Sequence, residues 1–264
     1  MISKGSMSQG IRFFTGVLAA GMVCVGVSAA APEATAFKPG KVPPANQPDI
    51  SGVWVVTNFS PYGKTIDGKE PPLQKWARDI ALQRRALADQ GHPFPDSETY
   101  CFTPGMPRMM FGPGYPIQIV QTAGQVTMLF EILHNVRFIY LTDKHSSLDD
   151  IDPSYHGESI GHWDGDTLVI DTTDMTDKST MDKGGTPHSD ALHVVERIRL
   201  TGKDKMEDLV TMEDSKAFTA PWIFRATFDR EPAGTRLQEY FCENNRNPVN
   251  QEGYVQFKGN KDNK

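Results

Sequence analysis

The sequence predicts an all-β domain, which forms a single antiparallel up-and-down barrel or a strongly curved sheet (calycin-like), with one covering helix. Three observations lead to this prediction. Short β-favouring stretches follow one another at hairpin spacing along most of the chain, and glycine-containing turns separate several of them. Only one stretch places apolar residues at helical spacing over several turns. No internal repeat or linker divides the domain, so one core is expected.

The stretch from Ser159 to Leu200 organises the predicted sheet. Asp164-Gly165 lies between two β-favouring runs and is typical of a type I′ hairpin, because both central residues of that turn need positive φ. The return strand covers 166–172, and a polar loop separates it from the next strand, 194–200. Other strands are expected at 49–56, 117–122, 125–133, 136–141, 205–213, 221–229 and 235–242.

Residues 1–30 are expected to be a secretory signal. Two basic residues precede an apolar run at 13–27, and small residues suited to cleavage follow it. The run is short for a membrane span, and no other apolar stretch could cross a bilayer. The mature protein would then be periplasmic or secreted, with an extended leader at 31–48, a barrel-like domain at 49–246 and a loose tail at 247–264.

The one predicted helix begins at Pro71-Pro72 and ends at Gly91. We expect its apolar stripe to pack on the sheet; the stripe consists of Leu73, Trp76, Ile80 and Leu87. The irregular stretch 92–116 follows, with several prolines and methionines. So much apolar surface in a loop must cover something, either a pocket rim or a satellite core.

Composition and motifs exclude several classes of protein. The net charge of −6 and the absence of a Lys/Arg run argue against nucleic-acid binding. No nucleotide-binding, serine-hydrolase, zinc-protease or calcium-loop signature is present, so no cofactor is expected. Signal cleavage would leave two cysteines, Cys101 and Cys242, and in an oxidising compartment these predict a disulfide.

Glu196 is the strongest candidate for chemistry. In a strand it shares one face with Val194, Ile198 and Leu200, so burial would raise its pKa and it would need a partner. One interpretation is structural: Glu196 pairs with a buried arginine. The functional interpretation has Glu196 and a histidine sharing acid/base work in the barrel mouth.

The histidines of that functional interpretation are His188 and His193, and Asp171 ends a strand near the same loop. His188, His193 and Glu196 could also ligate a metal. However, His193 and Glu196 differ by three positions and would point to opposite faces of a regular strand, so no metal site is predicted.

The expected binding residues flank the same region. Glu131 lies opposite Arg137 if the connection between their strands has three residues, whereas a two-residue connection places them on opposite faces; the sequence leaves this register open. The other candidates for substrate contacts are Tyr155, Trp163, Trp222 and Arg225. The arginine partner of Glu196 would be Arg137 or Arg225.

These motifs resemble an uncharacterised family of secreted bacterial proteins. The pattern is S-I-G-x-W-x-G-D-T-L-V-x-D-T from Ser159, followed by P-H-S-D-A-L-H-V-x-E-R from Pro187. The resemblance covers nearly all of the mature chain, and it implies an exported single domain without an assigned activity. Gly52-Val53-Trp54 also resembles the opening motif of lipocalins, a similarity at the level of the fold alone.

Two functions follow as expectations. The first is a cofactor-independent enzyme, of lyase, isomerase or hydrolase type, that acts on a small, largely apolar or aromatic molecule in the barrel. The second is a carrier that holds such a molecule unchanged. Because Glu196 is a titratable group on an otherwise apolar face, the sequence favours the enzyme slightly. Neither the substrate nor the oligomeric state follows from the sequence.

Overall fold

The computed structural model describes residues 47–58, 63–111, 114–146, 152–240 and 242. Within them, nine strands and one α-helix are formed. The strands are β1 (Gly52–Val56), β2 (Ile117–Gln121), β3 (Gln125–Phe130), β4 (Val136–Tyr140), β5 (Glu158–Asp164), β6 (Thr167–Thr173), β7 (His193–Gly202), β8 (Lys205–Glu213) and β9 (Trp222–Arg230). The predicted signal, leader and tail lie outside the described residues.

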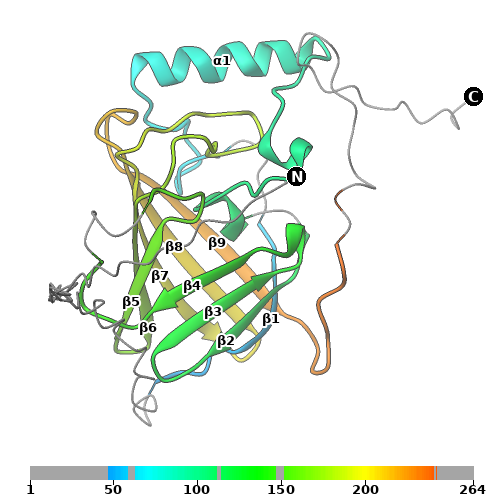
Figure 1. Cartoon of the computed structure of the whole chain (residues 1–264), viewed down its shortest axis with the longest axis vertical. Helices are drawn as coiled ribbons and strands as arrows, with labels where there is room; N and C mark the ends of the chain where they lie inside the picture. Colours follow the sequence, from blue (N-terminus) through cyan, green and yellow to red (C-terminus); the bar gives the residue numbers. More distant parts are fainter. Residues whose placement is uncertain (1–46, 59–62, 112–113, 147–151, 241, 243–264) are drawn as a thin grey trace, which may run out of the picture. The chain divides into compact units, whose positions relative to one another are not determined.

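The strands form a closed barrel in chain order, in which β1 pairs with β9 (Figure 1). The predicted all-β barrel with a covering helix is confirmed. Neighbouring strands are antiparallel except β4 and β5, which run parallel over Ile139↔Ser159 and Tyr140↔Ile160. The strictly antiparallel pattern therefore fails at this one pair, because the long connection 141–157 brings the chain back to the same end of the barrel before β5 begins.

The β5–β6 hairpin is confirmed, but its turn is displaced by one residue. Asp164 pairs with Thr167, so the two central residues are Gly165 and Asp166. Of these two only Gly165 has a positive φ, 63°. A glycine at the first central position is the pattern of a type II′ turn, which fits the strand twist as well as the expected type I′ turn does.

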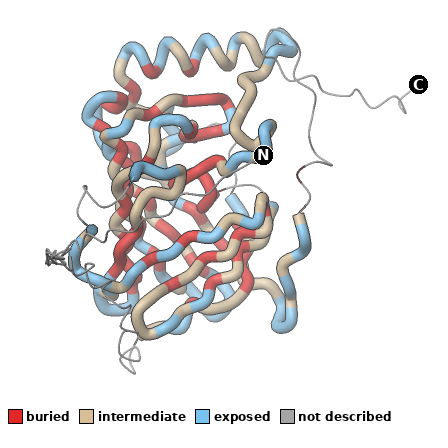
Figure 2. Tube along the Cα trace, in the orientation of Figure 1, coloured by how far each residue is buried: buried red, intermediate tan, exposed pale blue. Residues whose placement is uncertain are grey.

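Burial alternates along the strands, as Figure 2 shows in red and blue. In β8 the inward side chains are Met206, Asp208, Val210 and Met212, and all four are buried. The inward face of every strand contributes to one hydrophobic cluster that fills the barrel, with Trp54 and Phe228 among its largest members. This is the single core that the period-two pattern predicts.

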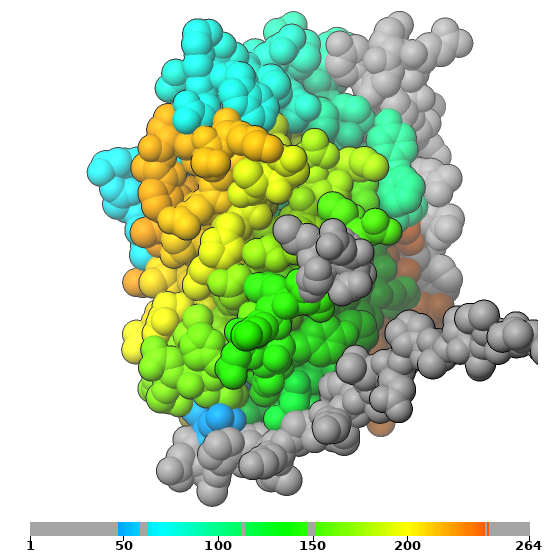
Figure 3. Space-filling model, turned by 60° about the vertical axis from the view of Figure 1, so that its left-hand side comes forward, coloured from blue at the N-terminus to red at the C-terminus, as the bar shows by residue number. Residues whose placement is uncertain are grey.

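The helix α1 (Lys75–Asp89) lies across one end of the barrel, on the loops that connect the strands there (Figures 1 and 3). Gln74 donates from its backbone to the carbonyl oxygen of Ala217 at 2.8 Å. The buried residues of the helix are Ala77 and Ala81, and Leu73 just before it is buried as well. The expected stripe is wrong at Trp76, which is 42 % exposed, since its indole reaches outward to the backbone of Lys216.

The segment before β2 closes the same end of the barrel. Met106, Met109, Met110 and Phe111 are all buried and belong to the main cluster, so they do not form a separate core, whereas Tyr100 and Phe102 earlier in the segment are exposed. Two short 3₁₀ turns shape it, η1 (Ser97–Tyr100) and η2 (Arg108–Phe111). The predicted Cys101–Cys242 disulfide is present and anchors this segment to the end of the described chain.

The expected strand at 235–242 is wrong. The barrel closes through β9 instead, and the pairing with β1 ends where the backbone of Glu231 donates to the carbonyl of Val53. Pro232 follows at once and has no N–H to continue the ladder. Among the described residues, no helix is long and apolar enough to span a bilayer.

Candidate functional site

A belt of polar side chains crosses one half of the barrel interior. It consists of Arg137 from β4, Ser159 from β5, Thr172 from β6, Glu196 from β7 and Asp208 from β8. Each is at most 2 % exposed. Five consecutive strands thus each place one polar group on the inward face. The register of these strands brings the groups side by side.

Arg137 and Glu196 form a bidentate salt bridge at the centre of the belt. One guanidinium nitrogen donates to Glu196 Oε1 at 3.0 Å and the other to Oε2. The interpretation of Glu196 as the partner of a buried arginine is therefore confirmed, and the arginine is Arg137. A planar guanidinium suits this geometry because its two parallel N–H groups match a carboxylate.

The two hydroxyl groups of the belt complete the coordination of Arg137. Its Nε donates to Ser159 Oγ at 3.1 Å and its Nη2 to Thr172 Oγ1 at 3.0 Å. The two hydroxyl oxygens are themselves 3.0 Å apart. Four hydrogen bonds from Arg137 are therefore made within the barrel, which offsets part of the desolvation of a buried cation.

Asp208 has no comparable set of partners. It lies diagonally from Glu196, and its direct cross-strand neighbours are Ile198 and Ala226, both apolar. Neither carboxyl oxygen has a partner in good hydrogen-bond geometry, although the Glu196 side chain and the Arg197 backbone lie near enough to interact with it. Burial raises the pKa of Asp208 well above its ordinary value, the negative charge of Glu196 adds to this, and the charge of Arg137 opposes it. Burial and the neighbouring Glu196 charge therefore favour the protonated, neutral form of Asp208.

The other half of the interior is apolar. Strands β9, β1, β2 and β3 contribute inward side chains that include Phe228, Trp54, Ile119 and Met128. Met206 and Met212 flank Asp208 along β8, and both are buried. The interior thus has one polar wall and one apolar wall, with flexible thioether side chains between them.

Asp171 and His193 lie on the outer face of the barrel and do not meet Glu196. They alternate with the inward residues Thr172 and Val194, so the strand period turns them away from the core. Asp171 Oδ1 is 3.1 Å from His193 Nε2 and 2.9 Å from His145 Nε2. The expected combination of Glu196 and His193 in one cavity is not what the structure shows.

His145 extends this outer cluster. Its Nδ1 is 2.9 Å from Glu158 Oε2, and His193 Nδ1 is 3.8 Å from Glu213 Oε2. The row Glu158–His145–Asp171–His193–Glu213 thus alternates carboxylates and imidazoles across β5 to β8. Partial burial alone lowers the pKa of His145, but its hydrogen bonds and the charges of Asp171 and Glu158 raise it overall. No group of three metal-ligating side chains converges in the part of the chain that the structure describes.

His188 is buried in the capping loops, apart from the belt. Its Nε2 is 2.8 Å from Ser179 Oγ, and its Nδ1 is 2.9 Å from the carbonyl oxygen of Ser189. This fixes Nδ1 as the protonated nitrogen, since a carbonyl can only accept. Burial lowers the pKa of His188, so the ring is neutral and both nitrogens are satisfied. A nearby acid, Asp214, accepts from the backbone and the hydroxyl of Ser189.

The remaining predicted contacts lie apart from the belt. Glu131 lies just after the end of β3 and accepts from the backbone of Gln238 at 2.6 Å. Arg137 pairs across the strands with Met128, so neither the two-residue nor the three-residue connection considered from the sequence joins β3 to β4. Arg225 is exposed and faces Glu207.

The three aromatic candidates, Tyr155, Trp163 and Trp222, make contacts within the fold. Tyr155 accepts a backbone hydrogen bond from Met106, and it is half-buried. Trp222 packs edge-on against Phe218 at the capped end. Trp163 packs against the core from a partly buried position. The indole N–H groups of Trp163 and Trp222 are buried and have no partner.

Sequence reasoning missed Ser159, Thr172 and Asp208. For Asp208 a signal was available: it alternates with Met206, Val210 and Met212, the same pattern that identified Glu196. Ser159 and Thr172 carry no such signal, because small hydroxyl residues are common at both faces of a strand.

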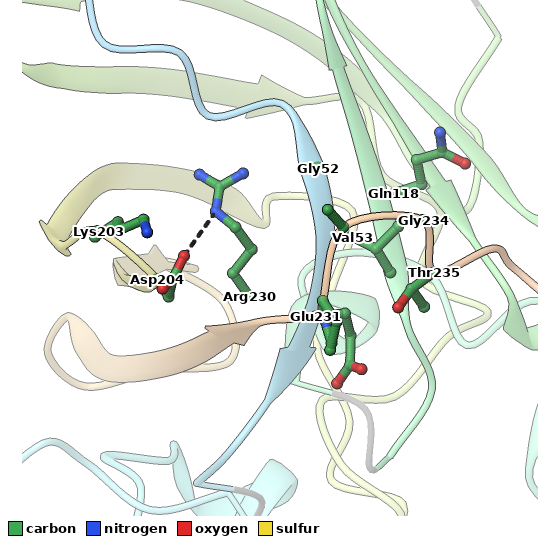
Figure 4. A pocket seen from close by; sticks show the side chains of 11 residues that line it. Gly52, Val53, Gln118, Lys203, Asp204, Arg230, Glu231, Gly234 and Thr235 are labelled. Atoms are coloured by element: carbon green, nitrogen blue, oxygen red, sulfur yellow. Dashed lines mark ion pairs between the residues drawn. The ribbon is translucent and has the colours of Figure 1, made fainter.

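A surface hollow of about 860 Å³ lies beside the start of β1 (Figure 4). Arg230 lies on one wall, with its Nε 3.8 Å from Asp204 and its guanidinium 4.1 Å from the centre of the Trp54 ring. Lys203 and Glu231 also line it. Two cations and two carboxylates balance there, and the hollow is open to solvent, so it has no clear preference for a charged ligand.

No protein-family model matches this chain, and neither does any curated protein sequence. Among solved structures, the crystal structure of the wild-type fluorescent protein UnaG is similar, with 12 % identity and a TM-score of 0.32, over 69 % of this chain and 97 % of that one. A point mutant of UnaG gives 11 % identity and the same TM-score, over 69 % and 95 % of the two chains. These values are too low to assign a family or to transfer a ligand.

Proposed function

We propose that the protein binds a small, largely apolar molecule inside the barrel. The observation that carries this proposal is Asp208, an acid that is 0 % exposed and whose carboxyl oxygens have no partner in good hydrogen-bond geometry, although the Glu196 side chain and the Arg197 backbone interact with it. Unsatisfied buried polar groups are rare in native proteins, and each calls for a reason. Glu196 has both carboxyl oxygens paired with Arg137, as we expect of a carboxyl with a structural role. The incomplete pairing of Asp208 instead suits a carboxyl that hydrogen-bonds to a ligand.

The surroundings of Asp208 support a deformable binding site. Met206 and Met212 flank it along β8, and Met128, the cross-strand neighbour of Arg137, belongs to the same core cluster. Unbranched thioether side chains repack around a guest at low cost. The belt is closed to solvent, so a ligand would enter by displacing methionines of the capping segment, such as Met106 and Met110.

The test is a titration with N-phenyl-1-naphthylamine, an uncharged dye that fluoresces in apolar surroundings. We expect saturable binding of one dye per chain. Asp208→Leu fills the site with an apolar side chain and should weaken binding at least tenfold. Thr211→Leu makes a related change on the outward face of the same strand and should leave binding unaltered.

Phe138 provides the second control, because it belongs to an exposed aromatic pair with Tyr140 on the outer surface of β4. If Phe138→Ala removes the dye signal while Asp208→Leu does not, the dye binds that outer surface and the proposal is wrong. Unfolding curves for each variant show that a loss of binding is not a loss of folding.

Acid/base catalysis without a cofactor is the second candidate function. It is favoured by the neutral acid Asp208 next to the arginine-paired carboxylate of Glu196, since acid/base enzymes often hold two carboxyls in different protonation states. The histidines and Asp171, expected as catalytic partners, do not contact this pair. A compound that displaces the dye and is recovered chemically changed, at more than one equivalent per protein, identifies the enzyme; recovery unchanged identifies the carrier.

We also propose export to the periplasm or beyond. The sequence of residues 1–30 and the disulfide between Cys101 and Cys242 support it. Cell fractionation of the full-length chain, with N-terminal sequencing of the mature form, tests this. Recovery of an uncleaved chain from the cytosol would contradict it.

A further inference from the structure

The polar wall of the barrel is electrically neutral, and its one cation is already engaged. Arg137 directs hydrogen bonds to both oxygens of Glu196, to Ser159 and to Thr172. A guanidinium has five N–H groups, so at most one remains for any other partner. The charge of Arg137 is cancelled by Glu196 at contact distance.

The other titratable groups near the belt do not supply a positive charge. Burial favours the neutral form of Asp208, and desolvation lowers the pKa of His156, which lies near Arg137. His156 Nδ1 donates to the carbonyl of Val136, and its Nε2 accepts from the hydroxyl of Thr103. No further charged side chain among the described residues is buried within this wall. A carboxylate ligand in the barrel would lose its hydration without gaining a counter-ion, and it would be repelled by Glu196.

A neutral ligand meets the opposite situation. The protonated carboxyl of Asp208 can donate one hydrogen bond and accept others; Glu196 and the Arg197 backbone interact with it on one side, whereas its cross-strand neighbour Ala226 is small and offers no side-chain partner. A carbonyl or hydroxyl group at this point would satisfy Asp208 without introducing charge. The apolar remainder of the ligand would lie against the wall formed by Trp54, Met128 and Phe228.

We infer that the barrel selects an uncharged ligand, an apolar molecule with a carbonyl or hydroxyl group, over the carboxylate of the same skeleton. This inference rests on the proposed function and states the chemical class of its ligand. Asp208 provides the polar contact, and the Arg137–Glu196 salt bridge remains intact when the ligand binds.

The experiment compares 1-decanol, 2-decanone and decanoate as competitors of the bound dye at pH 7.5, below their micelle concentrations. We expect the alcohol or the ketone to displace the dye at a concentration at least tenfold lower than decanoate. Tighter binding of decanoate overturns the inference. Binding of the dye with no displacement by any of the three overturns it as well, while leaving the proposed function standing; no dye binding at all removes both.

Two variants separate the role of Asp208 from simple hydrophobicity. Asp208→Asn keeps a donor and an acceptor, so the preference for the uncharged ligands should persist within about threefold. Asp208→Leu should reduce the affinity for 1-decanol to that for decane. Equal affinities of the wild type for decanol and decane contradict a polar contact at Asp208.

Glu196→Gln tests the charge balance. Removal of this counter-ion should narrow the preference for decanol over decanoate by at least fivefold, because Arg137 can then pair with the ligand. An unchanged preference in a folded variant means that the charge state of the belt does not select the ligand. Should this variant not fold, the wild-type competition among the three ligands still decides the inference.

Discussion

At the scale of single residues, the buried ion pair and the neutral acid behave differently. Arg137 has a full set of partners, and any change to it leaves charged or polar atoms unsatisfied. Asp208 has none in good geometry, and its neutral state results from burial and from Glu196. Mutations at the two sites should therefore shift the free energy of unfolding in opposite directions.

Arg137→Met should destabilise the fold by about 3–5 kcal/mol, because it leaves the carboxylate of Glu196 buried without a counter-ion. Glu196→Gln should cost less, because the glutamine carbonyl oxygen still accepts a hydrogen bond from Arg137. Urea unfolding of both variants measures this. Equal losses would show that this hydrogen bond does not offset the lost charge pair.

Asp208→Asn should stabilise the protein, and increasingly so as pH rises. The folded state keeps the proton on Asp208, whereas the unfolded state releases it above about pH 4. The unfolded state therefore binds fewer protons, and stability falls with rising pH. The asparagine variant lacks this dependence, so its advantage in urea unfolding should grow from pH 5 to pH 8. A loss of stability at pH 8 would mean that Asp208 has a structural partner.

At the scale of elements, the outer faces of β5 to β8 are joined by the row of carboxylates and imidazoles centred on Asp171. His145 is the member with a raised pKa. It lies in the connection after β4, so its contacts attach that connection to β5 and β6. The strength of this attachment should depend on the charge of the imidazole.

Stability should fall as pH rises through the raised pKa of His145. The folded protein holds the proton more tightly than the unfolded chain, so this contribution is fully present below the unfolded value of about 6.5 and lost above the folded pKa. His145→Asn should flatten this part of the pH profile. His162→Asn is the matched control, as His162 is exposed on β5, and it should leave the profile unchanged. Identical profiles for both variants would contradict the assignment.

The helix provides a second test at this scale. Ala77 is 0 % exposed against the capping loops, so Ala77→Leu should overpack the contact and cost about 1–3 kcal/mol. Ala86 is exposed on the same helix, and Ala86→Leu should change the free energy of unfolding by less than about 0.5 kcal/mol. A larger loss of stability for Ala86→Leu than for Ala77→Leu would show that the predicted stripe, with Trp76 facing inward, was right.

At the scale of the whole molecule, the Cys101–Cys242 disulfide joins residues 141 positions apart, across β2 to β9. A cross-link of this length removes conformational freedom from the unfolded chain. Reduction should therefore lower the free energy of unfolding by about 5 kcal/mol in the chain-entropy model. Urea unfolding with and without reductant measures this, and the double variant Cys101→Ser/Cys242→Ser should match the reduced protein. A loss below about 1 kcal/mol would show that the unfolded chain is already compact.

The sequence by itself determined the fold class, the β5–β6 hairpin, the single helix, the disulfide and the burial of Glu196. These follow from local signals: a period of two, turn glycines, helix-starting prolines and a pair of cysteines. The helix face was misjudged because alanine carries little hydrophobic signal, although Ala77 and Ala81 allow the closest approach.

Only the tertiary structure decided which groups meet. Arg137 and Glu196 are 59 residues apart, and the closure of β1 on β9, with the parallel step between β4 and β5, sets which inward positions share a level. The sequence placed Glu196 with histidines because they were near in the chain. The strand period turned His193 outward, and loop packing buried His188 with Ser179. Distance along a chain is a poor guide to distance across a barrel, because register and shear depend on every strand at once.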